Sequence, residues 1–311
     1  MRPKIYIDGQ AGTTALRIRE WLAGRNDLEV VTLPEELRKN AGARKEALKD
    51  ASIVVLCLPD DASKEAAAWL ADSPVRILDA STAHRVDDNW VYGLPELIAG
   101  QRERIAKAQR VANPGCYASA VILLTRPLVD AGLVSPDTPV AIHALSGYSG
   151  GGRALIERWE DPGRKLAHLP HEAPYSITRF HKHIPEMMRY GGLSAEPQFL
   201  PNVGPFRSGM RVEVMIPAKA LPKPGAGKMI KEILAARYQE ETFVKVESSA
   251  DEAEVNEFTF DPQAHNDTNV ISLRVLAHQS GHILLMARLD NLGKGGSSFA
   301  AIGAGADPRR S

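Results

Sequence analysis

Short apolar runs alternate with amphipathic stretches through the first third of this chain, and this alternation constrains the fold more than any other feature. Four of the runs have strand composition: 4–8, 28–33, 51–58 and 75–79. The segments between them favour helix: 13–22, 35–49 and 61–70. Because strands separated by helices pair in parallel, we expect an α/β domain here, with a Rossmann-type doubly wound parallel sheet.

The chain changes character after Pro114, where glycine, proline and histidine become more frequent. Segments 140–145 and 210–216 alternate as strands with one buried face, and 271–276 pairs with 282–289 as a predicted hairpin. The charged, proline-containing segment 157–175 is predicted to be a surface loop. We therefore expect a second, α+β domain with a mostly antiparallel sheet.

Length and composition agree with this two-domain prediction. A chain of 311 residues is too long for one ordinary core. The 38 basic and 38 acidic residues cancel, so nothing indicates a nucleic-acid surface. With only two cysteines and no apolar run of membrane-spanning length, we expect no disulfide framework, no membrane segment and a cytoplasmic location.

A glycine loop follows the first predicted strand and precedes the first helix. Gly9 and Gly12 allow a tight turn and close approach of backbone to a pyrophosphate, and the helix N-terminus adds unpaired N–H groups. The loop also contains Ala11, Thr13 and Thr14, and the two threonines add hydroxyl donors. The pattern predicts a dinucleotide site, with a simple tight turn as the alternative.

The second predicted strand ends Val31-Thr32-Leu33-Pro34, without the acid that commonly holds the ribose hydroxyls of NAD. Basic residues follow soon after, and a 2′-phosphate needs basic partners. The sequence therefore favours NADP(H), with Arg38 as the predicted phosphate contact. A solvated helix face is the alternative interpretation of Arg38.

Cys116 follows Asn113-Pro114-Gly115, a strong turn signal, and precedes an apolar stretch compatible with helix from residue 118 to 129. A cysteine at a helix N-terminus has its thiolate favoured by the helix dipole and by unpaired N–H groups. We predict that Cys116 is a nucleophile. Cys57 lies inside an apolar strand and is predicted to act as a small hydrophobic residue.

The segment 179–187 contains His181, His183 and Glu186, and histidine suits proton transfer near a reacting thiol. Two alternatives are a metal site built on the His-x-His pair and ordinary polar surface. No further Cys/His/Asp cluster has metal-ligand spacing, so we expect no metal. The serine- and glycine-rich segment 144–153 ends with Arg153 and is predicted to cradle a phosphate or to form a mobile loop.

Taken together, these segments make the chain resemble the shorter form of the N-acetyl-γ-glutamyl-phosphate reductases of arginine biosynthesis, and more distantly the aspartate-semialdehyde dehydrogenases. The motifs that carry the resemblance run in family order along the chain: IDGQAGTTA (7–15), CLPDDAS (57–63), DASTAHR (79–85), NPGCYAS (113–119), SGYSGGGR (146–153), HKHIPEM (181–187) and LDNLGKGGS (289–297).

The resemblance implies an NADP-binding domain from residues 1–112 and 290–311, and a catalytic and dimerisation domain from 113–289. It implies NADPH as cofactor, no metal, and a homo-oligomer (dimer or tetramer). The family has a long apolar helix after Gly296, whereas residues 297–308 here are short and glycine-broken.

The resemblance also assigns roles to individual residues. Cys116 matches the nucleophile, and His181 or His183 the acid/base, with His181 favoured. Residues placed near the cofactor or its junction with substrate are Pro59, Ser81 and Asn291, the last near the nicotinamide amide. Residues placed near the substrate or its phosphate are Arg85, Asn113, Ser146, Gly147, Arg153 and Glu186.

The predicted reaction is reductive dephosphorylation of N-acetyl-γ-glutamyl phosphate through a thioester on Cys116, with inorganic phosphate as the other product. The alternatives are the same chemistry on another acyl phosphate such as aspartyl phosphate, a non-catalytic NADP-binding regulator, and a metal hydrolase that uses His181 and His183.

Overall fold

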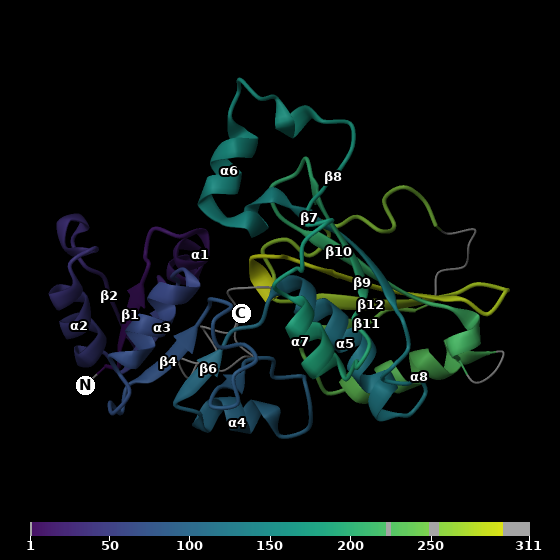
Figure 1. The fold of residues 1–311 in the computed structure, drawn as a ribbon, viewed down its shortest axis with the longest axis horizontal. Helices are drawn as coiled ribbons and strands as arrows, with labels where there is room; N and C mark the ends of the chain where they lie inside the picture. The colour runs from purple at the N-terminus through teal and green to yellow at the C-terminus, as the bar shows by residue number, and fades with distance from the viewer. Residues whose placement is uncertain (1, 222–224, 249–254, 295–311) are drawn as a thin grey trace. The chain divides into compact units, whose positions relative to one another are not determined.

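The chain forms two compact units in the computed structural model, which describes residues 2–221, 225–248 and 255–294 (Figure 1). The N-terminal unit runs up to Pro114, and the C-terminal unit begins at Gly115. The predicted contribution of residues 295–311 to cofactor binding, with the glycine-broken segment 297–308, lies outside the described residues. None of the described helices has the length and apolarity that crossing a membrane requires.

The N-terminal unit contains one six-stranded sheet in the order β2-β1-β3-β4-β6-β5, with every pairing parallel. Its strands are β1 (Lys4–Asp8), β2 (Glu29–Val31), β3 (Ile53–Leu56), β4 (Arg76–Asp79), β5 (Val91–Tyr92) and β6 (Arg110–Ala112). Its helices are α1 (Thr13–Leu22), α2 (Ala41–Asp50), α3 (Asp60–Ala68) and α4 (Gln101–Lys107). The predicted Rossmann-type sheet is confirmed.

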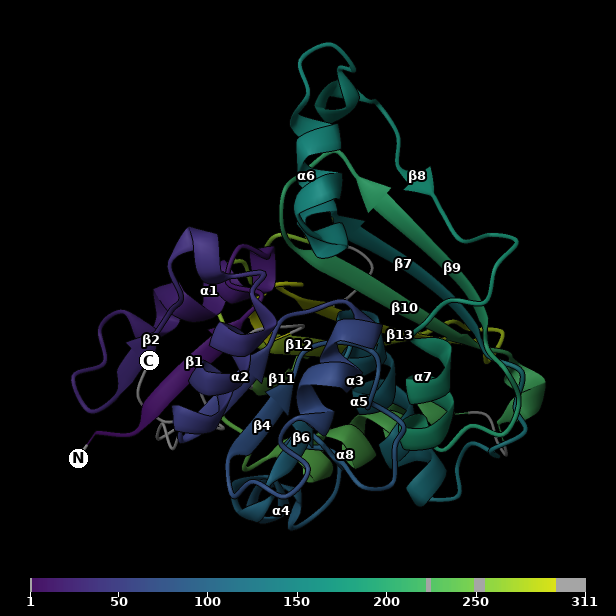
Figure 2. The same ribbon diagram turned by 60° about the vertical axis from the view of Figure 1, so that its left-hand side comes forward.

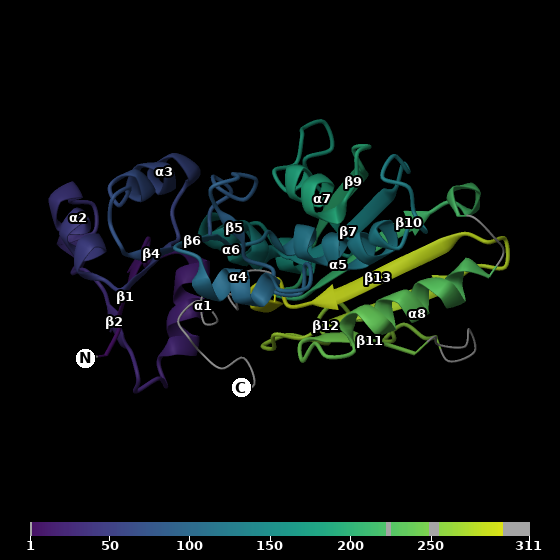
Figure 3. The same cartoon turned by 90° about the horizontal axis from the view of Figure 1, so that it is seen from below.

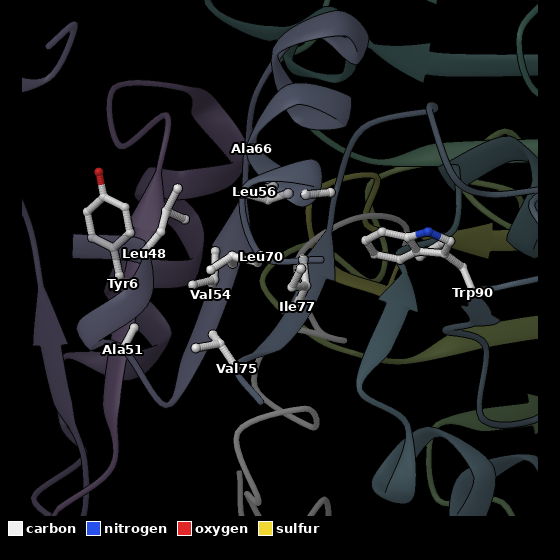
Figure 4. Packing of buried hydrophobic residues seen from close by; sticks show 12 residues of the cluster. Tyr6, Leu48, Ala51, Val54, Leu56, Ala66, Leu70, Val75, Ile77 and Trp90 are labelled. Atoms are coloured by element: carbon white, nitrogen blue, oxygen red, sulfur yellow. The ribbon is translucent and has the colours of Figure 1, made fainter. Parts of the chain in front are cut away.

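Side chains on the two faces of this sheet build two separate cores. Ile5 and Ile7 of β1 belong to one cluster, while Tyr6 between them belongs to the other, as the two-residue period of a strand requires. Figure 4 shows the second cluster, in which Val54 and Leu70 pack among residues of β3, β4 and α2. Burial on both faces explains why β3 is apolar without alternation.

The C-terminal unit contains a seven-stranded sheet in the order β11-β12-β13-β10-β7-β9-β8. Four of its six pairings are antiparallel, and the β7–β9 and β11–β12 pairings are parallel, so the predicted mostly antiparallel sheet is confirmed. The strands are β7 (Ala141–Gly147), β8 (Ala173–Pro174), β9 (Gln198–Gly204), β10 (Met210–Ile216), β11 (Val244–Val246), β12 (Ile271–Ala277) and β13 (Ile283–Leu289).

Three helices form a layer on one face of this sheet: α5 (Cys116–Asp130), α7 (Ile184–Gly191) and α8 (Ala226–Tyr238). Helix α5 contacts β10, β13, α7 and α8, and α8 lies along β12 (Figures 2 and 3). Leu285, Ala287 and Leu289 of β13 are fully buried on this face. Alternate residues of the strands face the other way, and on that face Leu200 of β9 and Met215 of β10 are exposed.

The prediction of a surface loop over residues 157–175 is wrong in part. Helix α6 (Gly152–Glu160) extends into it, followed by a short 3-10 turn (Leu166–His168) and β8. Trp159 of α6 is buried and stacks on Tyr148, with ring centroids 5.6 Å apart. This apolar contact stabilises the helix despite its charged composition.

The predicted helix over 35–49 is divided in the structure, because residues 35–37 form a 3-10 turn and Asn40 caps α2.

Gly9 offers a direct test of the turn after β1. Its φ is +84°, and an added Cβ would lie 2.2 Å from the carbonyl oxygen of Cys57. We expect Gly9→Ala to lower the free energy of unfolding by about 2 kcal/mol or more, measured by urea denaturation. The control is Gly24→Ala, whose Cβ would meet nothing within 4 Å. Equal stability of the two variants would contradict the conformation described for Gly9.

Candidate active site

Cys116 is the first residue of α5, and Gly115 before it is the N-cap in an extended conformation. The predicted position of this cysteine at a helix N-terminus is therefore confirmed. The positive end of the helix dipole and the unpaired N–H groups of the first turn favour the thiolate at this position. The charge on Cys116 acts on its surroundings, because it helps to raise the pKa of Tyr117 and Tyr175.

Glu186 fixes the turn that presents the cysteine. It belongs to α7, is 1% exposed, and its Oε2 accepts a hydrogen bond of 2.9 Å from the backbone N–H of Gly115. The family resemblance predicted Glu186 near the substrate or its phosphate. The structure gives its carboxylate a contact with the turn before α5, and this contact joins the histidine segment to the cysteine segment.

His181 and His183 are both buried. His183 is the N-cap of α7, and His181 lies two residues before it. Their ring centroids are 4.8 Å apart, and Tyr117, immediately after the cysteine, lies 5.7 Å from each of them. Phe199 of β9 contacts both His181 and Tyr117, with ring centroids 5.0 and 5.3 Å apart. The two histidines predicted from sequence thus share an aromatic cluster with the first turn of α5.

Hydrogen bonds set the tautomer of His181. The backbone N–H of His183 donates to Nδ1 of His181 at 3.2 Å. Because a backbone N–H can only donate, the neutral imidazole carries its proton on Nε2. That nitrogen lies 3.5 Å from the hydroxyl of Tyr175. His181 therefore directs its proton-bearing nitrogen toward the side chains around the cysteine.

Tyr117 and Tyr175 are site residues that sequence reasoning missed. The Tyr175 hydroxyl donates to the Tyr117 hydroxyl at 3.1 Å, and Tyr117 is also hydrogen-bonded to the side chain of Ser146. Burial is the main cause that raises the pKa of both phenols, so both remain protonated donors at neutral pH. The adjacency of Tyr117 to Cys116 was a signal for it. Tyr175 gave none, because it falls in the segment predicted as loop.

The serine- and glycine-rich segment starts at the end of β7. Ser146 is buried there, and Gly147 passes so close to residues 207–208 that an added Cβ would lie 2.5 Å from the Arg207 carbonyl oxygen. Arg153 is not in the glycine turn itself. It lies in α6 with its side chain 69% exposed and paired with Glu157 at 2.7 Å.

Asn291, predicted near the nicotinamide, lies just after β13 and is buried. Its Nδ2 donates to Ser149 Oγ at 3.0 Å, and its Oδ1 accepts from the backbone N–H of Gly209 at 2.8 Å. The amide therefore ties the segment after β7 to the turn before β10.

In the N-terminal unit the glycine loop has the conformation that a pyrophosphate site needs. The Gly12 N–H donates to the Gly9 carbonyl oxygen at 3.0 Å, which closes a tight turn. Gly12 is the N-cap of α1 and makes no side-chain cap, so Thr13 and Thr14 begin the helix with their N–H groups available to an anion. Ala11 is exposed at the tip of the turn. These residues fit a dinucleotide.

Other predicted residues of this unit lie at the carboxyl ends of its strands. Pro59 is the N-cap of α3, after β3, and Asn113 follows β6. Ser81 and Arg85 follow β4, where Arg85 donates to the carbonyl oxygen of Ala80 at 3.2 Å. In an open parallel sheet, ligands bind at this edge. Arg38, the predicted 2′-phosphate contact, is paired with Glu35 at 2.5 Å.

Asp79, at the end of β4, is a fully buried carboxylate that sequence reasoning did not single out. It accepts hydrogen bonds from Ser63 at 2.6 Å and from Ser81 Oγ at 2.7 Å, and His84 Nδ1 lies 2.6 Å away. Burial alone would raise the pKa of Asp79, but these hydrogen bonds outweigh it and lower the pKa.

Cys57 lies just after β3 and differs from Cys116 in its electrostatics. Burial, together with the nearby carboxylates of Asp79 and Asp8, raises its pKa to about 12. Its thiol is therefore inert at neutral pH, as predicted from its apolar neighbours. Among the described residues, no group of three or more histidine, cysteine, aspartate or glutamate side chains is arranged to hold a metal ion.

Comparison with known families agrees with this geometry. Residues 12–108 match the semialdehyde dehydrogenase NAD binding domain, and residues 116–291 match the semialdehyde dehydrogenase dimerisation domain. The chain belongs to the semialdehyde dehydrogenase family.

Within this family the chain is similar to N-acetyl-γ-glutamyl-phosphate reductases, as its motifs predicted. It is 43% identical to that of Trichormus variabilis, over 96% of this chain and 94% of the relative. It is 45% identical to N-acetyl-γ-glutamyl-phosphate reductase 2 of Pseudomonas putida, with the same coverage.

Solved structures of aspartate semialdehyde dehydrogenases share the fold. The Vibrio cholerae aspartate semialdehyde dehydrogenase II matches with a TM-score of 0.73 at 16% identity, covering 98% of each chain. The Candida albicans enzyme, solved with NADP, matches with a TM-score of 0.66 at 13% identity, covering 98% of this chain and 96% of that one.

The two cysteines should differ sharply in reactivity. We expect iodoacetamide at pH 8 to label Cys116 in the folded protein and to leave Cys57 unmodified, measured by peptide mass spectrometry. With a pKa of about 12, Cys57 is ionised to only about one part in 10⁴ at that pH. Unfolding in urea is the control, since both cysteines should then react. Equal labelling of both in the folded protein would contradict the environments described.

Proposed function

We propose that this protein is an NADPH-dependent N-acetyl-γ-glutamyl-phosphate reductase, which forms N-acetylglutamate semialdehyde and inorganic phosphate through a thioester on Cys116. The observation that carries the proposal is the first turn of α5, where Cys116 lies beside the His181, Tyr117 and Tyr175 cluster. The relatives that are 43–45% identical over nearly the whole chain bear this name, and this similarity supports the choice of substrate.

In this proposal the two units divide the work. Residues 1–112 with 290–311 bind NADP(H), and residues 113–289 carry the covalent chemistry. Gly9, Ala11, Gly12, Thr13 and Thr14 would receive the pyrophosphate on their backbone and hydroxyl groups. When bound, NADPH supplies the hydride.

The chain's own residues perform the covalent steps. The Cys116 thiolate attacks the acyl carbonyl, the carbon–oxygen bond to phosphate breaks, and the thioester forms. Backbone N–H groups in the first turn of α5 stabilise the oxyanion, a contribution of about 3 kcal/mol per donor. After reduction the thiohemiacetal oxyanion collapses to the semialdehyde and expels the Cys116 thiolate. His181 is the proposed proton carrier, because its Nε2–H can donate a proton to that oxyanion and regain it as the thiolate leaves.

Substrate contacts complete the proposal. Ser146 and Gly147 line the end of β7 beside Tyr117, and Arg153 and Arg85 are the proposed guanidinium groups for the departing phosphate. Glu186 and the backbone of His183 hold the turns that carry Cys116 and His181. Asn113 remains a proposed substrate contact. Pro59, Ser81, Arg38 and Asn291 remain proposed cofactor contacts.

A single substitution tests the thioester. We expect Cys116→Ser to lower phosphate-dependent reduction of NADP by N-acetylglutamate semialdehyde by about 10³-fold or more, because serine has no thiolate to acylate. Cys57→Ser is the matched control and should keep near-wild-type turnover.

Near-wild-type turnover of Cys116→Ser would eliminate the proposed chemistry. A wild-type protein that is active with aspartate semialdehyde but not with the acetylated glutamate substrate would instead move the proposal to another acyl phosphate.

The proposal includes a homo-oligomer in the cytoplasm. The family model for residues 116–291 is named for dimerisation, and the sheet face opposite α5 and α8 exposes Leu200 and Met215. On the same face His143 and Arg211 each lie 2.5 Å from Glu213.

The proposed cytoplasmic location agrees with the two cysteines, which are free thiols and not a disulfide, as a reducing compartment favours.

Two equally exposed methionines test the interface. We expect Met215→Glu to shift the protein toward monomer in sedimentation velocity, because it places a charge on the proposed apolar contact. Met229→Glu is the matched control, since Met229 on α8 is 42% exposed and Met215 is 41% exposed. A monomeric wild type, or an effect of the control alone, would contradict this interface.

A further inference from the structure

Asp8 is a charged residue in an unexpected place. It is the last residue of β1 and directly precedes the glycine loop, and its side chain is 3% exposed. Ligands of a parallel sheet bind at the carboxyl ends of its strands, and the ligand proposed here carries a doubly charged pyrophosphate. A bare carboxylate at this position would repel that ligand.

Arg44, one turn into α2, neutralises this carboxylate. Its Nε lies 3.2 Å from both oxygens of Asp8, and its Nη2 donates to Oδ2 at 2.8 Å. The hydrogen bonds from Arg44 to Asp8 are the main cause that raises the pKa of Arg44. Tyr6 adds a longer hydrogen bond of 3.4 Å to the same carboxylate.

The surroundings of Arg44 hold its guanidinium group in position. Asn40 caps α2 by accepting from the Ala43 N–H at 2.9 Å, which sets the helix start next to Arg44. The guanidinium carbon lies 5.1 Å from the ring centroid of Trp69, at the end of α3. Lys45 approaches the same ring at 4.7 Å. In this pair Asp8 is buried and Arg44 is partly buried, and the guanidinium group is held by several hydrogen bonds and by aromatic packing.

A second buried carboxylate, Asp79, ends β4, and it too is hydrogen-bonded, by His84, Ser63 and Ser81. At both positions the negative charge is matched by donors of the N-terminal unit itself.

We propose that Arg44 is a positioning residue for dinucleotide binding, which acts through Asp8 by cancelling its charge beside the Gly9–Gly12 loop. The inference rests on the proposed function only in taking the ligand to be NADP(H). Arg44 is distinct from the predicted 2′-phosphate contact Arg38, because two of its three guanidinium nitrogens are committed to Asp8.

The test compares the NADPH affinity of variants in which the charges of Asp8 and Arg44 are removed. Affinity is measured without turnover, by titration of nicotinamide fluorescence and by calorimetry. We expect Arg44→Gln to weaken NADPH binding by about 10-fold or more, because Asp8 is left uncompensated. Asp8→Asn combined with Arg44→Gln should recover an affinity within about 3-fold of wild type, since no charge then remains. Arg44→Lys keeps the charge and should also stay within about 3-fold.

Lys45→Gln is the matched control, because it removes a cation from the same helix and the same tryptophan ring without touching Asp8. It should leave the NADPH affinity unchanged. If Arg44→Gln proves too unstable to measure, the double variant and Arg44→Lys still decide the question. A double variant that folds but binds NADPH at least 10-fold more weakly than wild type would overturn the proposal, as would an Arg44→Gln variant with wild-type affinity.

Wild-type protein is titrated first, which separates the two proposals. No binding of NADPH by the wild type would reject the proposed function itself. Normal wild-type binding with no dependence on the Asp8–Arg44 charge balance would reject only the role of Arg44.

Discussion

One hydrogen bond, from the backbone N–H of Gly115 to the carboxylate of Glu186, organises the candidate active site. The two residues are 71 positions apart in the chain, and each adjoins a reactive group. Gly115 caps the helix that begins with Cys116, and Glu186 lies in the helix preceded by His183. Because the carboxylate is buried, this contact fixes the cysteine turn and the histidine segment relative to each other with little freedom.

The two cysteines show how position alone gives one side chain two different properties. Cys116 lies at the positive end of a fifteen-residue helix, and its charge acts on the phenols of Tyr117 and Tyr175. Cys57 lies at the end of a buried strand near two carboxylates, which together with burial raise its pKa to about 12. The helix dipole favours one thiolate, while desolvation and negative charge oppose the other.

Elements with strong local periodicity were predicted well. The expected strand over 4–8 and helix over 13–22 agree with β1 and α1 residue for residue. Their spacing of apolar residues is regular because each buried face packs against one hydrophobic cluster of the N-terminal unit. Helix α6 was missed, since its stability depends on Trp159 stacking against Tyr148, a contact with a separate segment of the chain. Tyr175 was missed for the same reason, because its hydroxyl partners are 58 and 6 positions away.

The sequence by itself determined the two folding units, the glycine loop and the candidate residues Cys116, His181 and His183, because turn chemistry, hydrophobic period and motif order are local properties. Tertiary structure alone decided that Tyr175 reaches Tyr117 and that Arg44 neutralises Asp8. These outcomes depend on distances between side chains from separate elements. Such distances follow from how helices and strands pack, and no local pattern encodes them.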